Sequence, residues 1–286
     1  MALSNFIPEV WSAELLLALK KRHVAAALVN RDYEGEIGRQ GDTVHVTNLT
    51  APTIGTYTKH TDITVEDIDD GTAALTIDQA KYFAFEVDDV EKAQQVAGGN
   101  ALSTQTQEAG YGLADVADRF LLSTMNTAVQ GTGNDLGTVA IHTDADALYE
   151  SIVDLMVKLD TANVPDAGRF VIVSPSLHGR LLKLDRFVAS GDEKAAASRG
   201  NGHIGQVAGL DIYKSNNLPT VTDVDATGGL ALAGHRIATS FAEQIVHVEA
   251  ARMEKRFADM VKGLHVYGAK VFRPTALAVA EFDATA

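Results

Sequence analysis

The stretch TYTKHTDITVEDIDDGT, residues 56–72, constrains this chain more than any other segment. Its β-branched residues favour an extended strand, whereas acidic side chains from Asp62 to Asp70 leave neither face of that strand apolar. A strand of this kind has no core of its own to hold it in place. The stretch is therefore either disordered or covered by a surface outside its own domain.

Composition places the rest of the chain among folded proteins. The 286 residues are 46% hydrophobic and 22% charged, which predicts a globular protein of one or two domains. The chain contains no cysteine, which excludes disulfides, thiolate metal sites and cysteine nucleophiles and favours synthesis in a reducing cytoplasm. No apolar run approaches the roughly 20 residues of a membrane span. In MALSNFIPEVWSAELLLALKKRH the basic cluster follows the apolar patch, the wrong order for a secretory signal, so we expect a soluble protein that is not exported.

The charge of the chain bears on its partners. The formal net charge is −14, the pI is near 5.0, and no basic block occurs beyond Lys20, Lys21 and Arg22. Tight nucleic-acid binding needs several cations that displace counterions from phosphates. The sequence therefore argues against direct, high-affinity DNA binding, but it suits the wall of a container to which nucleic acid does not adhere.

The N-terminal part predicts an arm followed by a long hairpin. Residues 8–29 predict one or two helical turns. Residues 42–49 alternate as a strand, and residues 73–87 predict the return strand. The hairpin over residues 42–87 would have an apolar base and a polar tip at about residues 53–71, which is marginal alone in water. Its outer half is therefore predicted to lie on a neighbouring copy of the same protein.

A long helix is the next predicted element. A short helix with an acidic start is expected at residues 88–95, and residues 102–128 carry the apolar stripe of a long amphipathic helix. Gly110 and Gly112 lie inside it and each cost about 1 kcal/mol relative to alanine. We expect the helix to bend at these glycines.

Residues 136–245 predict an α/β region, and the tail after it predicts strands. Ser174 followed by Pro175 is a helix-start signal. Residues 185–206 are small and polar and predict a loop, whereas residues 245–282 alternate as strands. Because these strands are expected to pack on the distant long helix, we predict a discontinuous domain. The expected helices are 144–162, 176–184 and a Ser240-capped 241–244, and the expected strands are 169–173, 210–214 and 230–234.

Two glycine-rich segments are candidate cofactor sites. Gly200–Gly205 matches G-x-G-x-x-G, but a dinucleotide site needs a preceding strand and a following helix. Here a polar loop precedes the motif and a strand follows it, so loop flexibility explains it better. Gly131, Gly133 and Gly137 have the wrong spacing and are interpreted as a connector.

Two acidic groups are candidate metal sites. His142, Asp144 and Asp146 offer one nitrogen and two carboxylates, but they also lie where a helix begins, and capping is the favoured interpretation. The hairpin tip lacks EF-hand spacing and is interpreted as a solvated turn or as a partner for a neighbour's cations. The acidic residues of the tip are Glu66, Asp67, Asp69 and Asp70.

Serine and histidine residues do not form a convincing catalytic pattern. Ser174, Ser176 and His178 lie in SPSLHG, which is not a G-x-S-x-G elbow, and helix capping accounts for the serine and the proline. The strand-pattern histidines are expected at surface or satisfied positions. These are His45, His247 and His265. The sequence predicts no catalytic, cofactor-binding or metal-binding residue.

The order of elements resembles the major capsid proteins of tailed bacteriophages, which have the Hong Kong 97-type fold, an α+β class. The similarity runs along nearly the whole chain, and no single motif in it is diagnostic. The stretches that carry it are VNRDYEGEIGRQGDTVHV (29–46), FEVDDVEKAQ (85–94), FLLSTMNTA (120–128), RFVIVSPSLHGRLLKLDRF (169–187) and GAKVFRPTALAVAEF (268–282).

The resemblance implies an architecture and a function. Residues 1–41 would be an N-terminal arm, residues 42–87 an extended loop, residues 88–135 with 246–286 a peripheral domain that contains the spine helix, and residues 136–245 an axial domain. Many copies would form pentamers and hexamers of an icosahedral virion shell around double-stranded DNA, assembled in the host cytoplasm. Scaffolding, portal and decoration proteins are the implied partners, without sequence-specific DNA binding or a membrane.

Some family features are not expected here. The chain starts almost directly at its arm, which implies a separate scaffolding protein or prior processing, and there is no room for an inserted domain. Lys59 lies near the hairpin tip, but no asparagine can be matched to it, so no cross-link is predicted. The resemblance also implies a rounder precursor shell in which the helix bends at Gly110 and Gly112. The alternatives are an encapsulin-type nanocompartment shell and, from another class, a dinucleotide-dependent enzyme that uses Gly200–Gly205.

Overall fold

The computed structural model describes most of the chain. The described residues are 24–33, 41–49, 54–60, 62, 70–88, 101–141, 146–184, 205–219, 229–253 and 256–283. Most of the predicted arm, the predicted helix over 88–95 and most of the predicted loop over 185–206 lie outside these ranges.

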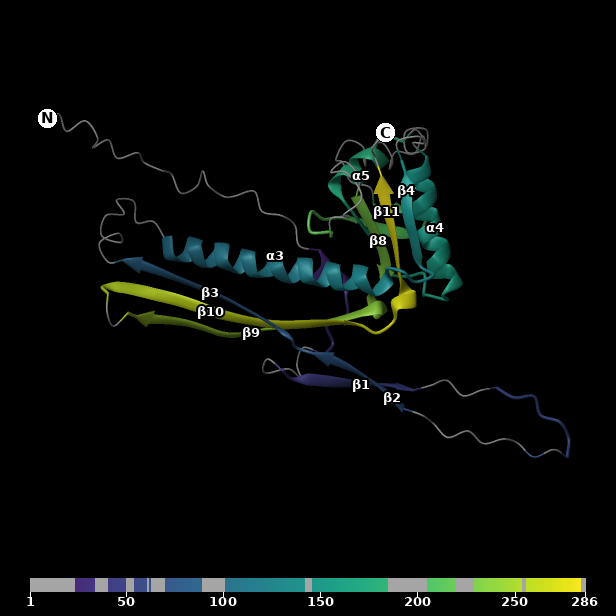
Figure 1. Ribbon diagram of the computed structural model, residues 1–286, viewed down its shortest axis with the longest axis horizontal. Coiled ribbons are helices and arrows are strands. Elements are labelled where there is room, and N and C mark those ends of the chain that lie inside the picture. The colour runs from purple at the N-terminus through teal and green to yellow at the C-terminus, as the bar shows by residue number, and fades with distance from the viewer. Residues whose placement is uncertain are drawn as a thin grey trace.

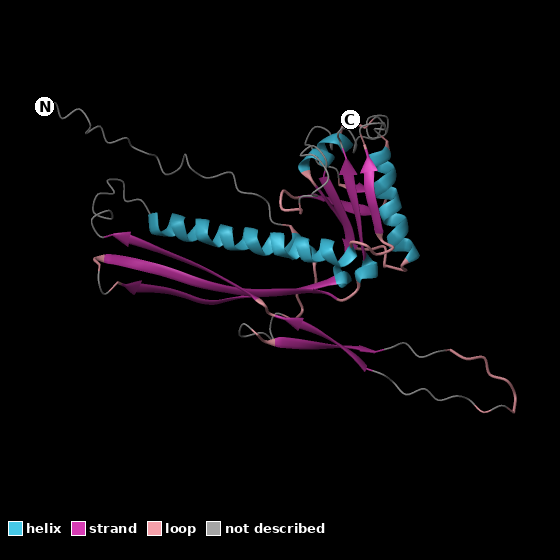
Figure 2. Ribbon diagram, in the orientation of Figure 1, coloured by secondary structure: helices cyan, strands magenta, loops and turns pink. Residues whose placement is uncertain are grey.

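The described fold contains a long helix, a three-stranded sheet, a six-stranded sheet with its helices, and a projecting two-stranded ribbon. Helix α3 lies along a three-stranded sheet, an α/β unit stands at one end of that helix, and a two-stranded ribbon projects from the sheet (Figure 1). Figure 2 shows that helices are concentrated along the long sheet and around the α/β unit, whereas the ribbon has none. The fold is therefore a mixed helix and sheet structure. The strand orders are β1-β2, β3-β10-β9 and β4-β11-β8-β5-β7-β6.

The bounds of these elements follow the chain order. The helices are α1 (Ala25–Leu28), α3 (Ala101–Val129), α4 (Ala147–Thr161) and α5 (Pro175–Leu181), with 3-10 turns η2 (Arg236–Ala238) and η3 (Pro274–Ala276). The strands are β1 (Thr43–Leu49), β2 (Asp70–Thr76), β3 (Gln79–Asp88), β4 (Asp135–Ala140), β5 (Arg169–Val173), β6 (Gln206–Val207), β7 (Leu210–Lys214), β8 (Gly229–His235), β9 (Thr239–Arg252), β10 (Ala258–Val271) and β11 (Leu277–Asp283).

Helix α3 confirms the long helix predicted for residues 102–128. Its apolar stripe is buried in the main core from Ala117 onward, whereas Leu113 is half-buried and Val116 is 41% exposed. The helix runs through Gly110 and Gly112 without interruption, and both glycines lie at exposed positions with open space around them. The buried residues of its second half include Leu121, Leu122, Met125 and Val129.

The α/β unit is built on a buried central strand. Every residue of β5 is buried, as the apolar run RFVIV predicts. Helix α4 covers the sheet with an apolar face, and its lysine in the last turn suits the helix dipole. Ser174 caps α5 as predicted, because its side chain accepts a hydrogen bond from Leu177 N and Pro175 occupies the first turn.

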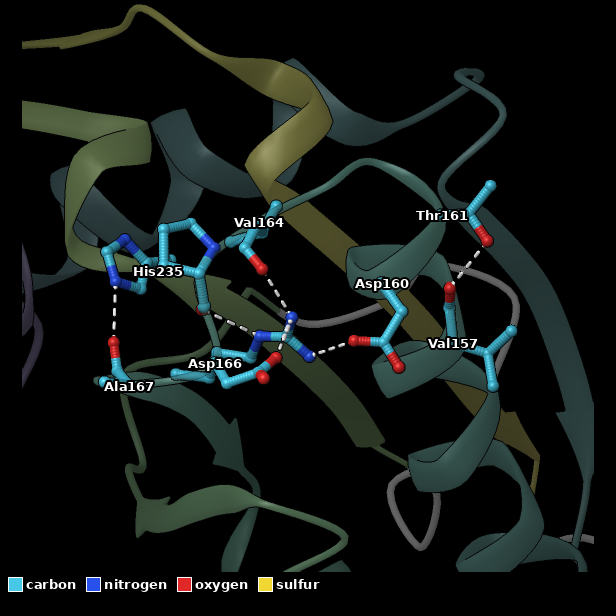
Figure 3. A network of polar contacts seen from close by, with 9 residues as sticks. Val157, Asp160, Thr161, Val164, Asp166, Ala167 and His235 are labelled. Atoms are coloured by element: carbon cyan, nitrogen blue, oxygen red, sulfur yellow. Dashed lines mark hydrogen bonds and ion pairs between the residues drawn. The ribbon is translucent and has the colours of Figure 1, made fainter.

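A buried guanidinium closes the turn between α4 and β5. Arg169 is only 4% exposed, and its nitrogens donate to the carbonyls of Val164 and Pro165 at 2.5 and 2.9 Å. It also pairs with the carboxylates of Asp160 and Asp166 at 2.6 and 2.8 Å (Figure 3). The planar fork of arginine suits such multiple acceptors. The side chain therefore satisfies two backbone carbonyls of the turn and joins them to the carboxylates of Asp160 and Asp166.

A histidine fastens the same turn from β8. The His235 ring bonds the Ala167 carbonyl through Nε2 at 2.9 Å, and its Nδ1 accepts from Ile237 N at 3.2 Å (Figure 3). Since Nδ1 accepts, Nε2 carries the proton and donates. The turn after α4 is thus held from two strands of the sheet.

The predicted return strand over 73–87 is wrong as a single strand. It divides into β2, which pairs with β1, and β3, which pairs with β10. Between them Ile77 is fully buried in a second, smaller core. This core attaches the ribbon to the three-stranded sheet and consists of Val44, Leu75, Ile77, Ala242 and Val266.

Gly268 permits this attachment. A Cβ atom at Gly268 would lie 2.3 Å from the Thr76 carbonyl oxygen and 3.0 Å from the Ile77 Cα. Only a residue without a side chain therefore lets the ribbon base cross β10 at this distance.

The predicted Ser240-capped helix at 241–244 is also wrong, because these residues belong to β9. Phe241 and Ala242 are both buried, one against Tyr267 in the main core and the other in the second core. A strand covered on both faces loses the alternation that identifies it.

The last strand of the tail lies outside the three-stranded sheet that runs along the long helix. Strand β11 lies in the six-stranded sheet between β4 and β8. Residues 277–280 are buried in succession, so this strand is covered on both faces. Strand β10 and the second half of β9 are the parts of the tail that belong to the three-stranded sheet.

Candidate assembly surface

The far part of the ribbon exposes apolar side chains. Residues 54–60 continue beyond the paired strands, and Ile54 and Tyr57 are 97% and 72% exposed. Full burial of such a side chain contributes about 1.5 to 3 kcal/mol. Exposed apolar groups on a projecting element indicate a binding surface.

The outer face of the three-stranded sheet is covered by the ribbon base around Val266 but is uncovered farther along. Tyr82 and Leu264 lie opposite each other on β3 and β10, and they are 79% and 37% exposed. Helix α3 covers the other face, where the rings of Phe120 and Tyr267 meet at 5.4 Å. Leu264 and Tyr267 point to opposite faces because their spacing along the strand is odd.

A groove adjoins this face at the edge of the sheet. It has a volume of about 570 Å³ and lies between β3 and α3. Tyr82 and Phe83 line it from the strand, and Leu113 and Val116 line it from the helix. Strand β3 is an edge strand, so its outer backbone groups have no neighbouring strand among the described residues.

A polar cluster anchors the residues around α1 to the sheet. The Arg31 guanidinium donates to Glu243 Oε1 at 2.6 Å, and His265 Nε2 lies 3.2 Å from Glu243 Oε2. The hydrogen bond from His265 and the charge of Arg31 outweigh partial burial and lower the pKa of Glu243 below its ordinary value of 4.5. Asn30 continues the attachment with backbone hydrogen bonds on both sides of Ser240.

We expect Glu243→Gln to flatten the acid dependence of stability. Because the folded pKa of Glu243 is lowered, its carboxylate stabilises the fold above pH 4.5, and this contribution is lost as the pH falls through the folded pKa. Urea midpoints measured between about pH 6 and pH 3 should fall less steeply for the variant than for the parent chain. Glu150→Gln, at an exposed position of α4, is the control and should keep the parent slope. Equal slopes for Glu243→Gln and the parent would contradict this assignment.

Apart from Gly137, the described glycine-rich candidates lie in connectors. Gly205 precedes strand β6 rather than a helix, as predicted, while residues 200–204 lie outside the described ranges. Gly131 and Gly133 lie in the turn between α3 and β4, whereas Gly137 lies within β4. Gly131 and Gly137 have positive φ angles of 72° and 68°, and their amides donate to the Asp135 carboxylate. The connector interpretation is therefore confirmed for Gly131 and Gly133 and is wrong for Gly137.

The acidic candidates are only partly described. His142 and Asp144 lie outside the described residues, and Asp146 occupies the N-cap position of α4 without a capping hydrogen bond from its side chain. Glu66, Asp67 and Asp69 of the tip are also outside, and Asp70 begins β2. The described residues contain no group of three or more histidine or acidic side chains placed to hold a metal ion.

The serine and histidine candidates have structural contacts. Ser174 Oγ lies 2.9 Å from Ser176 Oγ at the start of α5, and His178 is buried in that helix. His45 and His247 lie on strands whose side chains are not described there, and Lys59 is an exposed turn residue. No helix in the described part of the chain is long and apolar enough to cross a membrane.

Sequence patterns missed residues that join distant parts of the chain. Arg31 and Glu243 are 212 residues apart, and nothing local pairs them. Asp118 also joins distant segments, through hydrogen bonds to Ala25 and Asn217. Its sequence position could have indicated this, because it is an acidic residue beside Ala117 and three residues before Leu121 of the apolar stripe of α3. A carboxylate in that position predicts a buried polar contact.

Comparisons with known proteins agree with this architecture. Residues 72–280 match the family described as phage capsid protein. A solved structure from Mycobacterium phage Che8 is 36% identical, with a TM-score of 0.79 and 99% of each chain covered. The capsid of cyanophage P-SCSP1u is 16% identical, with a TM-score of 0.78 and coverage of 98% of this chain and 94% of that one. The capsid of Ralstonia phage GP4 is 14% identical, with a TM-score of 0.66 and coverage of 100% and 98%. No curated protein sequence matches the chain.

Proposed function

This chain belongs to the phage capsid protein family, and from that premise we propose how its copies assemble. It is a major capsid protein, a structural component of the bacteriophage virion that forms a shell. We propose that its copies form pentamers and hexamers of an icosahedral head, and that the ribbon of each copy lies over the adjacent copy. The observation that carries this proposal is the uncovered ribbon with Ile54 and Tyr57.

The proposed layout is that of the Hong Kong 97-type fold. Residues 1–41 are the arm, residues 42–87 the extended loop, and residues 136–245 the axial domain. Residues 88–135 with 246–286 form the peripheral domain, except that β11 is assigned to the axial domain and that β3 and the first half of β9, which pair with β10, are assigned to the peripheral domain. Helix α3 along its three-stranded sheet supports the peripheral assignment, and the six-stranded sheet supports the axial one.

We propose that the shell encloses double-stranded DNA without sequence-specific binding. The net charge of −14 supports this, since an acidic wall does not hold a polyanion tightly. Scaffolding, portal and decoration proteins are the proposed further partners, and the host cytoplasm is the proposed place of assembly. The protein acts as a structural component, and no enzymatic role is proposed.

Electron microscopy and sedimentation of the purified chain test this function. Closed shells or curved sheets are expected as the concentration rises. A chain that remains monomeric at high concentration, with or without a scaffolding protein from the same phage, would contradict the proposal.

The ribbon contact has its own test. The double variant Ile54→Ser with Tyr57→Ser should raise the concentration needed for assembly at least about tenfold, because each lost apolar contact is worth about 1.5 kcal/mol or more. The unfolding of dilute chains should stay unchanged, since both side chains are exposed there. Val157→Ser, at a half-exposed position of α4, is the control and should leave assembly unchanged. A double variant that assembles like the parent would place the neighbour contact elsewhere.

A further inference from the structure

A single buried carboxylate joins three distant parts of the chain. Asp118 of α3 is 3% exposed, and its Oδ1 accepts hydrogen bonds from Val24 N at 3.2 Å and Ala25 N at 2.9 Å. Its Oδ2 accepts from Asn217 Nδ2 at 2.9 Å. These partners lie 93 to 99 residues away in the sequence. The carboxylate therefore bonds the start of α1, helix α3 and the turn after β7.

The buried carboxylate of Asp118 orients its partners more than it stabilises the fold. None of the described lysine, arginine or histidine side chains forms an ion pair with Asp118, so neutral donors satisfy it. Burying a carboxylate costs several kcal/mol before its hydrogen bonds compensate, and an apolar side chain would pack here without that cost. Hydrogen bonds, however, are directional, so the carboxylate fixes how its three partners are oriented.

The Asn217 side is itself held in place. Asn217 is 4% exposed, its backbone amide donates to Ser215 Oγ at 3.1 Å, and Ser215 N donates to the Val173 carbonyl at 3.1 Å. The contact of Asp118 with Asn217 is therefore linked through Ser215 to β5, the buried centre of the α/β unit.

The segment on the other side is anchored at both ends. Val24, Ala25 and Val29 are buried in the main core. Asn30 then bonds β9, and Arg31 bonds Glu243. Residues 24–31 are thus a fixed part of the body, and Asp118 holds their first two amides. Figure 1 shows this short segment passing beside α3 close to the α/β unit.

We propose that Asp118 is a positioning residue for assembly. It holds residues 24 and 25, to which residues 1–23 are attached, in a fixed position relative to both α3 and the α/β unit, so that an arm contact with a neighbouring copy starts from a defined point. This inference rests on the proposed role of residues 1–41 as an arm that contacts other copies.

A double-mutant cycle separates this role from simple stabilisation. Asp118→Asn keeps the shape but replaces one acceptor oxygen by an NH₂ group. Assembly thresholds are measured for the full chain and for a chain lacking residues 1–23, each with and without the substitution. We expect Asp118→Asn to raise the protein concentration needed for assembly about tenfold in the full chain and less than about twofold in the shortened chain. The difference between these two effects lies within the range of coupling energies measured by double-mutant cycles. Asp154→Asn, at an exposed position of α4, is the charge-matched control and should change neither threshold.

The outcomes are distinguishable. An equal effect of Asp118→Asn in both backgrounds would overturn the inference, because the residue would then act only on stability. A shortened chain that assembles like the full chain would contradict the proposed arm contact itself, and the inference with it. If Asp118→Asn does not fold, Asn217→Ala takes its place in the cycle, because it removes only the bond to the α/β unit. Asn217→Ala should also raise the assembly threshold more in the full chain than in the chain lacking residues 1–23, although by less than Asp118→Asn. An equal change in both backgrounds would overturn the inference.

Discussion

Gly268→Ala is expected to detach the ribbon from the body of the protein. The new methyl group would lie 2.3 Å from the Thr76 carbonyl oxygen and 3.0 Å from the Ile77 Cα, which are backbone atoms that cannot rotate away. Overpacking of this kind costs about 1 to 3 kcal/mol, and more where the backbone must shift. Because the second core lies under this crossing, we expect a loss of about 3 kcal/mol in the free energy of unfolding. Assembly should fail with it.

Urea unfolding followed by circular dichroism measures this loss. Gly112→Ala is the control, because an added Cβ meets nothing within 4 Å there and an alanine stabilises a helix by about 1 kcal/mol relative to glycine. A second comparison is Gly263→Ala, where the added Cβ would meet the Phe83 ring, a side chain that can turn aside. A Gly268→Ala variant as stable as Gly263→Ala would show that the ribbon base does not lie against β10 at this distance.

Arg169→Met is expected to be the second large loss. The methionine fills part of the volume but leaves the carbonyls of Val164 and Pro165 without their donor. The contact with the Val164 carbonyl is buried, and that with the Pro165 carbonyl is only partly buried. An unsatisfied buried acceptor costs about 1 to 3 kcal/mol, so a loss of about 2 to 3 kcal/mol in the free energy of unfolding is expected. The ion pairs of Arg169 contribute less to the free energy of unfolding than the hydrogen bonds to the carbonyls, because the Asp160 and Asp166 side chains are 48% and 94% exposed.

Thermal and urea unfolding of three variants test whether the carbonyl hydrogen bonds of Arg169 contribute more to stability than its ion pairs. Asp166→Asn should change the free energy of unfolding by less than about 0.5 kcal/mol. Arg169→Lys should lie between the parent and Arg169→Met, because an ammonium cannot reach all of these acceptors. If Asp166→Asn destabilises as much as Arg169→Met, the exposed ion pair rather than the carbonyl contacts stabilises this turn.

Local patterns predicted the elements that local physics determines. The stripe of α3, the apolar run of β5 and the Ser174 cap are all set by residues within a few positions of one another. The α+β class and the family followed from the order of such elements.

Contacts between distant segments account for the errors. The sequence around Phe241 lacks alternation because two separate cores cover β9, and the break at Ile77 exists because β10 passes beside it. The contact of Glu243 with Arg31 and that of Asp118 with Asn217 join residues 212 and 99 positions apart. No window of sequence contains both partners, so only the folded chain reveals them.

The central claim is that the exposed ribbon of one copy is covered and ordered by contact with an adjacent copy. Hydrogen exchange followed by mass spectrometry measures this most directly, on residues 54–60 in dilute single chains and in assembled shells. We predict rapid exchange of these amides in the single chain and strong protection in the shell. Full protection in the dilute chain, or exchange that stays equally rapid after assembly, would contradict the claim.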